Sequence, residues 1–281
     1  MKVFETIKET KDHLYNKRQK ENSIGFVPTM GCLHAGHTSL LQQAKKENDI
    51  LVCSIFVNPK QFDNPEDLKK YPRNFEKDLD ILSNYDCDIV FTPSVEEMYP
   101  EPVNEVYHFG ELEDTMEGFY RKGHFNGVAI VVKRLLEIIQ PDRAYFGKKD
   151  YQQLLVVKQL VKKTNLPVEI VPSDTVREAD GLAMSSRNQK LTPQQRKDAA
   201  TIYKALCKVK ELYPKKSIAE LKEMITYEIN AKPTLQTEYI EIVNPENLKP
   251  LKPDQPDQNA IACIAVYAGK TRLIDNMLLN E

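Results

Sequence analysis

Short apolar runs alternate with amphipathic helical patterns between residues 24 and 171. Runs rich in β-branched and aromatic residues predict strands over 24–28, 50–57, 88–92, 143–146 and 167–171. Between these runs, apolar residues recur at three- and four-residue spacing and predict helices over 37–48, 75–85, 125–140 and 150–164. Strands that alternate with helices are typical of βαβ units, so this part is expected to form a parallel sheet covered by helices.

The pattern changes near Val176, where capped helices precede strands in which apolar and polar residues alternate. The Thr-Pro-Gln-Gln stretch at 192–195 reads as an N-cap, a first-turn proline and a capping-box glutamine, and it predicts a helix to about residue 213. A Ser-x-x-Glu pattern at 217–220 predicts a second helix that ends before Pro233. Antiparallel strands are then expected over 237–243, 261–268 and 270–275, with an exposed loop over 245–258.

Taken together, the two patterns predict an α/β protein of two domains. The first is a Rossmann-like parallel-sheet domain over residues 1–175, and the second is a smaller α+β domain over residues 176–281.

Composition narrows the class of protein. The chain has 281 residues, of which 41% are hydrophobic and 28% are charged, and its formal net charge is −2. These values are typical of a globular protein and give no indication of nucleic-acid binding. The N-terminal sequence lacks the apolar core of a signal peptide, and no window approaches about 18 continuous apolar residues, so we expect a cytoplasmic location without membrane contact. The five cysteines show no C-x-x-C spacing and are expected to be reduced core residues.

The stretch VPTMGCLHAGHTSLL at 27–41 contains two of the five histidines, His34 and His37, at the start of a predicted helix. A motif that follows the first strand of a parallel sheet lies at the edge where ligands bind, and the unpaired N–H groups of a helix start favour anions there. Gly31 and Gly36 allow a sharp turn and a close approach to a ligand. Two imidazoles at such a place suit a polyphosphate, although the same spacing is compatible with a simple helix cap.

Other common sites are less consistent with this stretch. H-A-G-H lacks both the H-E-x-x-H spacing and an obvious third zinc ligand. The chain contains neither a G-x-x-x-x-G-K-[ST] loop nor a G-x-G-x-x-G fingerprint. A nucleotide would therefore be bound by other means.

Four further polar segments follow predicted strands or lie at the expected domain boundary: SIFVNPKQF at 54–62, RKGHFNGV at 121–128, FGKKDYQQL at 146–154 and DGLAMSSRN at 180–188. Taken singly, each is compatible with a turn, a helix cap or a solvated patch. Hydroxyl groups and arginine can bind phosphate oxygens, and arginine can do so with two donors. Because these segments fall at strand ends or at the boundary, we interpret them jointly.

In this order, PTMGCLHAGH, SIFVNPKQF, YPR, RKGHFNGV, GKKDYQQL and VREADGLAMSSRN resemble the motif set of the pantoate–β-alanine ligase (pantothenate synthetase) family. They span residues 27–190, and the C-terminal part is compatible without being diagnostic. H-x-G-H alone resembles the wider superfamily of nucleotidylyltransferases and class I aminoacyl-tRNA synthetases. The resemblance implies an ATP-dependent condensation of (R)-pantoate with β-alanine, through pantoyl adenylate, to give pantothenate, AMP and pyrophosphate. It also implies a requirement for Mg²⁺ and a cytoplasmic homodimer. In each subunit, residues 1–175 are expected to form the catalytic domain that binds ATP and pantoate, and residues 176–281 a lid domain.

The resemblance implies roles for individual residues as well. The set that binds the ATP phosphates and stabilises the transition state comprises His34, His37, Lys149, Ser185, Ser186 and Arg187. The wider ATP site adds Met30, Gly36, Gly147, Asp150, Val176 and Met184. The pocket for pantoate and β-alanine comprises Pro28, Met30, Asn58, Gln61, Tyr71, Arg121, His124 and Gln153.

The chemistry of adenylation agrees with these roles. Negative charge concentrates on the phosphates, so catalysis is expected from fixed donors and cations, with Lys149 following the α-phosphate. Magnesium usually keeps several waters and binds through substrate phosphates, so few protein ligands are expected, with Asp78 as a candidate outer ligand.

Three residues depart from the family pattern. Cys32 stands where alanine is common, Thr38 where leucine is usual, and Lys148 where glutamate usually precedes the lysine. Lys148 reverses a charge beside Lys149 and can alter the ionisation or the phosphate affinity of that lysine.

Competing hypotheses keep the fold and change the function. One is a nucleotidylyltransferase whose final product retains the nucleotide, and another is a nucleotide-binding regulator without turnover. An aminoacyl-tRNA synthetase is less favoured, because the C-terminal part leaves little room for an RNA-reading module and the chain is not basic.

Overall fold

The structure is a computed structural model that describes residues 1–62, 65–69, 71–251 and 259–280. The chain divides into two compact units. The first comprises Met1–Lys148 and Gln153–Asp174, and the second comprises Lys149–Gln152 and the residues from Thr175 onward. The short segment Lys149–Gln152 thus packs as part of the second unit, which the sequence pattern did not indicate. The assignment of a catalytic domain and a lid domain stays a prediction.

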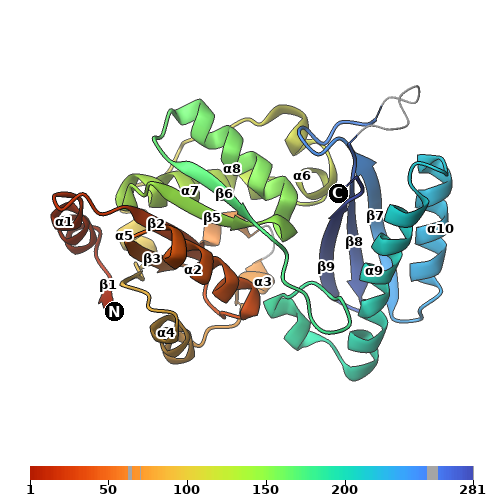
Figure 1. Cartoon of the computed structure of the whole chain (residues 1–281), viewed down its shortest axis with the longest axis horizontal. Helices are drawn as coiled ribbons and strands as arrows, with labels where there is room; N and C mark the ends of the chain where they lie inside the picture. The colour runs from red at the N-terminus through yellow and green to blue at the C-terminus, as the bar shows by residue number, and fades with distance from the viewer. Residues whose placement is uncertain (63–64, 70, 252–258, 281) are drawn as a thin grey trace. The chain divides into compact units, whose positions relative to one another are not determined.

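Among the described residues, six parallel strands form the sheet of the first unit (Figure 1). The strands are β1 Lys2–Phe4, β2 Ile24–Thr29, β3 Ile50–Ile55, β4 Ile89–Phe91, β5 Arg143–Gly147 and β6 Glu169–Ser173. Their order across the sheet is β1-β4-β3-β2-β5-β6. The predicted Rossmann-like parallel sheet is therefore confirmed, and β1 is an additional edge strand before the first predicted run.

Helices of the first unit cover this sheet. They are α1 Ile7–Arg18, α2 Ala35–Glu47, α3 Pro65–Lys69, α4 Phe75–Asn84, α5 Val95–Met98, α6 Met116–Tyr120, α7 His124–Ile139 and α8 Tyr151–Thr164, with short 3₁₀ turns η1 Pro59–Gln61, η2 Gly110–Glu113 and η3 Lys148–Asp150. Of these, the residues Lys149–Gln152 of η3 and α8 belong to the second unit. Helix α2, in orange-red, crosses one face of the sheet and packs against β2, β3 and β5 (Figure 1). Leu41 and Ala44 of α2 join Leu51 in one buried cluster, because apolar residues recur on a single helix face.

The chain reverses its direction across the sheet between β2 and β5. From β2 it continues to β3 on one side, whereas from β5 it continues to β6 on the other. Ligands of open parallel sheets bind beyond the carboxyl ends of the strands at such a reversal. Thr29 ends β2 and Gly147 ends β5, so the loop that carries His34 and His37 begins at this reversal.

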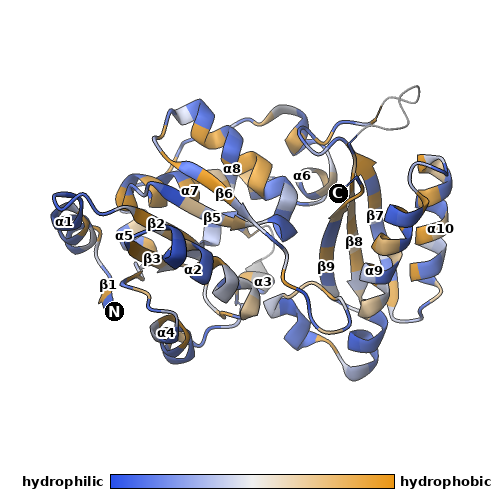
Figure 2. Ribbon diagram, viewed as in Figure 1, coloured by the Kyte–Doolittle hydropathy of each residue, from blue (hydrophilic) through white to orange (hydrophobic). Residues whose placement is uncertain are grey.

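Two helices and three antiparallel strands make up most of the described second unit. They are α9 Pro193–Leu212, α10 Ile218–Asn230, β7 Leu235–Val243, β8 Ile261–Ala268 and β9 Thr271–Leu278, with the 3₁₀ turn η4 Ser186–Lys190. Both predicted capping boxes are present, at Thr192 and Ser217. Apolar residues of α9 and α10 pack with the sheet in one cluster, and Figure 2 shows β8 largely in the hydrophobic colour. The predicted α+β fold is confirmed, while residues 252–258 of the expected loop lie outside the described residues.

The five cysteines were expected to be reduced residues of the core. All five cysteines are free, and Cys53, Cys87 and Cys263 are buried. Cys207 is exposed, so the prediction of a core position is wrong for that residue.

None of the helices in the described residues is long and apolar enough to cross a membrane.

Candidate functional site

The two histidines of the H-x-G-H motif form a reciprocal cap at the start of α2. His34 is the N-cap, and its Nδ1 accepts the Gly36 N–H at 3.1 Å, while the backbone N–H of His34 donates to His37 Nδ1 at 3.3 Å. The rings lie 4.1 Å apart between centroids. A backbone N–H can only donate, so both Nδ1 atoms are acceptors and each neutral ring carries its proton on Nε2. Capping and phosphate binding are therefore compatible, because they use different nitrogens of the same ring.

Asp78, from α4, holds the loop that leads to this cap. Its two carboxylate oxygens accept the backbone N–H groups of Cys32 at 2.8 Å and Leu33 at 2.7 Å, and its exposed fraction is only 2%. The loop needs this support because Gly31 and Cys32 have left-handed φ values of 78° and 54°. A Cβ at Gly31 would also lie 2.8 Å from Asp78 Oδ2. Asp78 is thus a structural anchor of the histidine loop, a role that the sequence did not indicate.

Replacing Asp78 with alanine is expected to lower the free energy of unfolding by about 2–4 kcal/mol, because two backbone N–H groups lose their acceptor. Urea unfolding followed by circular dichroism measures this change. Asp80→Ala is the matched control, since Asp80 is exposed on the same helix. An unchanged stability together with a raised Mg²⁺ requirement would instead support the hypothesis that Asp78 is a metal ligand.

The Cys32 thiol beside this loop is not activated as a nucleophile. Burial raises its pKa, and the Asp78 carboxylate raises it further. The thiol therefore stays protonated near neutral pH, which agrees with a mechanism that needs no covalent nucleophile.

Asn58 and Gln61 form a buried amide network after β3. Asn58 Nδ2 donates to the Gly127 carbonyl at 3.1 Å and to Gln61 Oε1 at 3.2 Å. Burial raises the pKa of Tyr99, so its hydroxyl stays protonated and donates to Asn58 Oδ1 at 2.9 Å. Because the Gly127 carbonyl can only accept, these contacts fix both amides, and Gln61 directs Nε2 toward Met30 Sδ at 3.1 Å. Two predicted pocket residues, Gln61 and Met30, are therefore in contact.

His124 and Arg121 hold the main chain of the same segment. His124 is 7% exposed, and its Nδ1 lies 2.8 Å from the Gln61 carbonyl oxygen. Its Nε2 lies 3.0 Å from Arg121 Nη1, and Arg121 is 3.9 Å from the Glu117 carboxylate. A guanidinium only donates and a carbonyl only accepts, so His124 is a neutral ring with its proton on Nδ1. In the described structure both residues thus support Gln61, and their contact with substrate stays a prediction.

Of the remaining predicted residues of the first unit, Pro28 and Gly147 lie near the carboxyl ends of β2 and β5. Pro28 pairs with Ser54 between β2 and β3, and Gln153 lies in the first turn of α8. Tyr71 makes an edge-to-face contact with Phe62 at 5.8 Å. At Gly147, the last residue of β5, an added Cβ would meet nothing within 4 Å. The protein itself therefore leaves space at Gly147, as expected where a ligand approaches the backbone.

A hairpin-like loop of the second unit brings together two residues predicted at the adenosine. Met184 N–H donates to the Val176 carbonyl at 3.0 Å, and Arg177 and Ala183 form an isolated antiparallel bridge. Gly181 turns this loop with a φ of 91°. The loop therefore holds Val176 and Met184 opposite each other.

The Ser-Ser-Arg segment continues from this loop into η4. Ser185 is the N-cap, and its Oγ accepts the backbone N–H of Arg187 at 3.2 Å. Ser186 is the first residue of η4, and the Arg187 side chain donates to the Arg272 carbonyl at 3.2 Å. All three side chains are half-buried. A half-buried arginine beside two hydroxyl groups is suited to a phosphate, although one Arg187 donor is already used.

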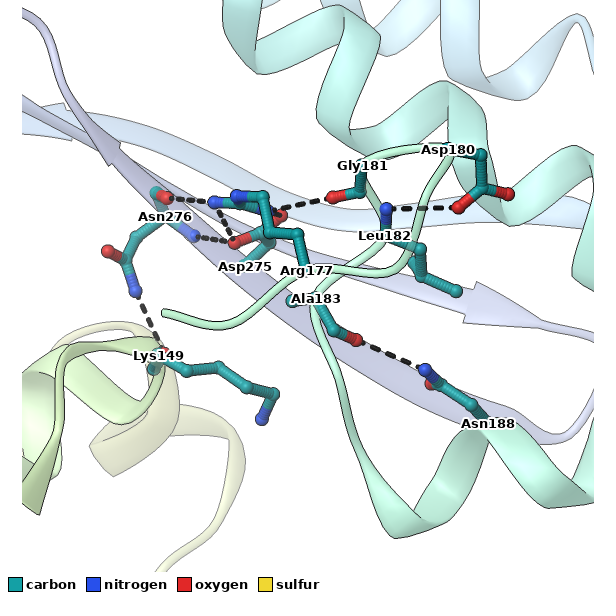
Figure 3. Close-up of polar contacts among 9 residues, drawn as sticks. All are labelled: Lys149, Arg177, Asp180, Gly181, Leu182, Ala183, Asn188, Asp275 and Asn276. Atoms are coloured by element: carbon teal, nitrogen blue, oxygen red, sulfur yellow. Dashed lines mark hydrogen bonds and ion pairs between the residues drawn. The ribbon is translucent and has the colours of Figure 1, made fainter. Parts of the chain in front are cut away.

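Figure 3 shows an ion-pair network that anchors the same loop and Lys149 to β9. Arg177 binds Asp275 with two hydrogen bonds of 2.7 and 3.1 Å and also donates to the Gly181 carbonyl. Asn276 Nδ2 donates to the Lys149 carbonyl at 2.8 Å. Burial raises the pKa of Asp275, and the Arg177 guanidinium opposes this shift. The motif analysis missed this network, although Asp275, a carboxylate at the end of the strand predicted over 270–275, followed by the amide Asn276, is unusual enough to indicate it.

The two adjacent lysines have different environments. Lys148 Nζ forms an ion pair with Asp174 at 2.7 Å within the first unit. Lys149 Nζ lies 3.6 Å from Asp150 within the second unit, and its side chain is 21% exposed. Asp174 therefore balances the positive charge of Lys148, which stands where glutamate is usual. Lys149 belongs to the segment Lys149–Gln152, whose first carbonyl accepts from Asn276.

Protein ligands for a metal are scarce. No group of three or more His, Cys, Asp or Glu residues among those that the structure describes is arranged to hold an ion.

Comparisons with known proteins agree with the motifs and the fold. The family model of pantoate-beta-alanine ligase matches residues 2–278. A pantothenate synthetase of Porphyromonas gingivalis is 45% identical over 277 residues, which cover 99% of both chains. The crystal structure of a pantothenate synthetase from Thermus thermophilus superimposes with a TM-score of 0.92 at 44% identity and covers both chains completely. A pantoate-beta-alanine ligase from Francisella tularensis gives a TM-score of 0.84 at 37% identity, covering 100% of this chain and 98% of that one. From its motifs, its fold and these relatives, the chain belongs to the pantoate–β-alanine ligase family.

Proposed function

We propose that the chain condenses (R)-pantoate with β-alanine in two steps that consume ATP. In the first, a pantoate carboxylate oxygen attacks the α-phosphorus, the bond to the β-phosphate oxygen breaks, and pantoyl adenylate and pyrophosphate form. In the second, the neutral amine of β-alanine attacks the acyl carbon, AMP leaves, and the amine loses a proton. The observation that carries this proposal is the histidine pair, which directs its Nε2 protons away from the helix cap at the reversal of a parallel sheet.

The phosphate-binding roles follow from charge and donor chemistry. His34 and His37 donate from Nε2 to phosphate oxygens, and Lys149 supplies the cation that follows the α-phosphate as charge accumulates. Ser185, Ser186 and Arg187 add hydroxyl and guanidinium donors. Gly36, Gly147, Asp150, Val176 and Met184 form the rest of the nucleotide site. The Francisella tularensis ligase, which was solved in complex with beta-gamma ATP and β-alanine, supports this use of ATP.

The pantoate site uses the amide network after β3. Gln61, whose amide is fixed by Asn58, donates through Nε2 to a polar group of pantoate, and Met30 with Pro28 provides apolar contact for its dimethyl carbon. Arg121 and His124 keep Gln61 in place. Tyr71 and Gln153 complete the pocket wall.

The adenylate is an activated acyl donor, so the second step needs mainly positioning of the amine. The ATP phosphates, rather than a cluster of protein ligands, would hold Mg²⁺, which would neutralise part of their charge. The enzyme is further proposed to act in the cytoplasm, with the second unit as its lid domain.

The chain is further proposed to act as a homodimer. Sedimentation velocity at micromolar concentration is the direct test, and a sample that contains only monomer would contradict the dimer without affecting the proposed reaction.

A product assay tests the reaction. The protein is incubated with ATP, Mg²⁺, (R)-pantoate and β-alanine, each substrate is omitted in turn, and AMP and pantothenate are followed by mass spectrometry. We expect AMP and pantothenate in equal amounts, and only in the complete mixture. Release of pyrophosphate with the nucleotide retained in the final product would support a nucleotidylyltransferase, and ATP binding without any product would support a regulator.

A further inference from the structure

The main chain of Lys149 is held by a side chain from far along the sequence. Asn276 Nδ2 donates to the Lys149 carbonyl oxygen at 2.8 Å, and both residues belong to the second unit (Figure 3). Asn276 is 9% exposed and lies in β9, between Asp275 and Met277. A buried amide that donates to a carbonyl fixes the plane of the peptide that this carbonyl belongs to.

Asn276 is itself fixed by the ion pair beside it. Its backbone N–H donates to Asp275 Oδ1 at 2.8 Å, and its carbonyl accepts from Arg177 Nη2 at 3.3 Å. Arg177 closes the network by binding both oxygens of Asp275, at 2.7 and 3.1 Å, and by lying over the ring of Tyr203 at 4.4 Å. Asp275 is 3% exposed, so this ion pair is screened little by water. These hydrogen bonds hold Asn276 in place, and its Nδ2–H connects the network to the backbone of Lys149.

The hydrogen bond to the Lys149 backbone matters because the lysine side chain is long and flexible. A lysine side chain reaches its target through four flexible carbon atoms, so the placement of its ammonium depends strongly on where its backbone begins. Lys149 lies in the short 3₁₀ turn η3 Lys148–Asp150, which supplies few hydrogen bonds of its own. An external hydrogen bond to this turn thus limits the positions that the ammonium can reach.

We propose that Asn276, held by the Arg177–Asp275 ion pair, is a positioning residue that sets the backbone of Lys149 for the adenylation step. The proposal rests on the proposed function, in which Lys149 acts on the ATP phosphates. In this role Asn276 acts through Lys149 and needs no contact with the substrate. Its loss therefore slows adenylation and leaves the transfer to β-alanine unchanged, because that second step depends on positioning of the amine rather than on the lysine.

Single-turnover formation of pantoyl adenylate tests this proposal in the full-length protein. Asn276→Ala is expected to slow the step about 10- to 100-fold, the size of effect that a displacement of about 1 Å produces. The KM for β-alanine and the rate of its reaction with added pantoyl adenylate stay at the parent values. Asn276→Asp is measured in parallel, because it has nearly the same size but replaces the donor with an oxygen. Asn280→Ala is the matched control, since Asn280 accepts the Ala260 N–H at 2.9 Å in the same unit and makes no contact with Lys149.

A double-mutant cycle separates positioning from a general structural role. In a Lys149→Ala background, Asn276→Ala should have little further effect on adenylation, because the residue through which it acts is gone. Equal slowing in both backgrounds would overturn the proposal, and so would a folded Asn276 variant whose rate stays within about threefold of the parent. If Lys149→Ala itself retains adenylation, the proposed function of Lys149 fails. If only the Asn276 variants retain it, the proposed function stands and the positioning role alone fails.

Discussion

Lys149→Ala is expected to slow the formation of pantoyl adenylate about 10³-fold, because the variant loses the cation that balances charge developing on the α-phosphate. Such interactions form mainly in the transition state, so kcat should fall more than the KM for ATP rises. The free energy of unfolding should change little, since the ion pair of the Lys149 ammonium in the described residues is a long one, 3.6 Å from Asp150. Rapid-quench measurement of pantoyl adenylate under single-turnover conditions gives the rate directly.

Lys148→Ala is the matched control for this experiment. Lys148 is the neighbouring residue and also a lysine, but its ammonium is paired with Asp174 at 2.7 Å. Its removal should leave adenylation within about threefold of the parent, because a partly exposed ion pair contributes little. If the two alanine variants lose activity equally, the central cation has been assigned to the wrong lysine or is shared by both.

The histidine pair should show the second-largest effect. His34→Asn and His37→Gln are each expected to slow adenylation about 10²-fold, because each variant loses the imidazole Nε2–H, and an amide whose oxygen accepts the cap bond places its own N–H groups elsewhere. Both substitutions preserve the cap of α2: asparagine is among the best N-cap residues, and glutamine is suited to the third position of a capping box. Adenylation rates report phosphate binding and urea unfolding reports helix capping, so measuring both on the same samples separates these two roles of the histidines.

His34→Ala provides the comparison at the same position. It should lose as much activity as His34→Asn and, in addition, about 1 kcal/mol of stability, because alanine caps poorly. Parent-like rates for His34→Asn and His37→Gln would mean that the two histidines serve only as a helix cap.

Local patterns were sufficient to predict most of the fold. The alternation of β-rich runs and helical spacing predicted β2 to β6 and the helices α2, α4, α7 and α8, and the two capping boxes predicted the starts of α9 and α10. Helix α1, Ile7–Arg18, was not predicted. Strand β1, Lys2–Phe4, was missed because three residues are too few for an alternation to be recognised. Short elements such as α5, Val95–Met98, were missed for the same reason.

The candidate site was less predictable, because its support comes from residues distant in sequence. The motif after β2 indicated His34 and His37, yet nothing in that motif indicates that the loop is anchored by Asp78, 44 positions after His34 in the printed sequence. Asn276 is likewise separated from Lys149 by 127 positions. Such pairs become visible only when the chain is folded, since periodicity describes neighbours along the chain and carries no information about distant partners.

The placement of Lys149–Gln152 has a consequence for dissecting the protein into fragments. The polypeptide passes between the two units after Lys148, after Gln152 and after Asp174. A fragment that ends at Asp174 would include Lys149 but lack Asn276, whereas one that ends at Lys148 would lose β6 from the parallel sheet. No single cut therefore yields two self-contained halves, and recombining separately expressed pieces, or exchanging one half with that of a relative, would require a discontinuous boundary.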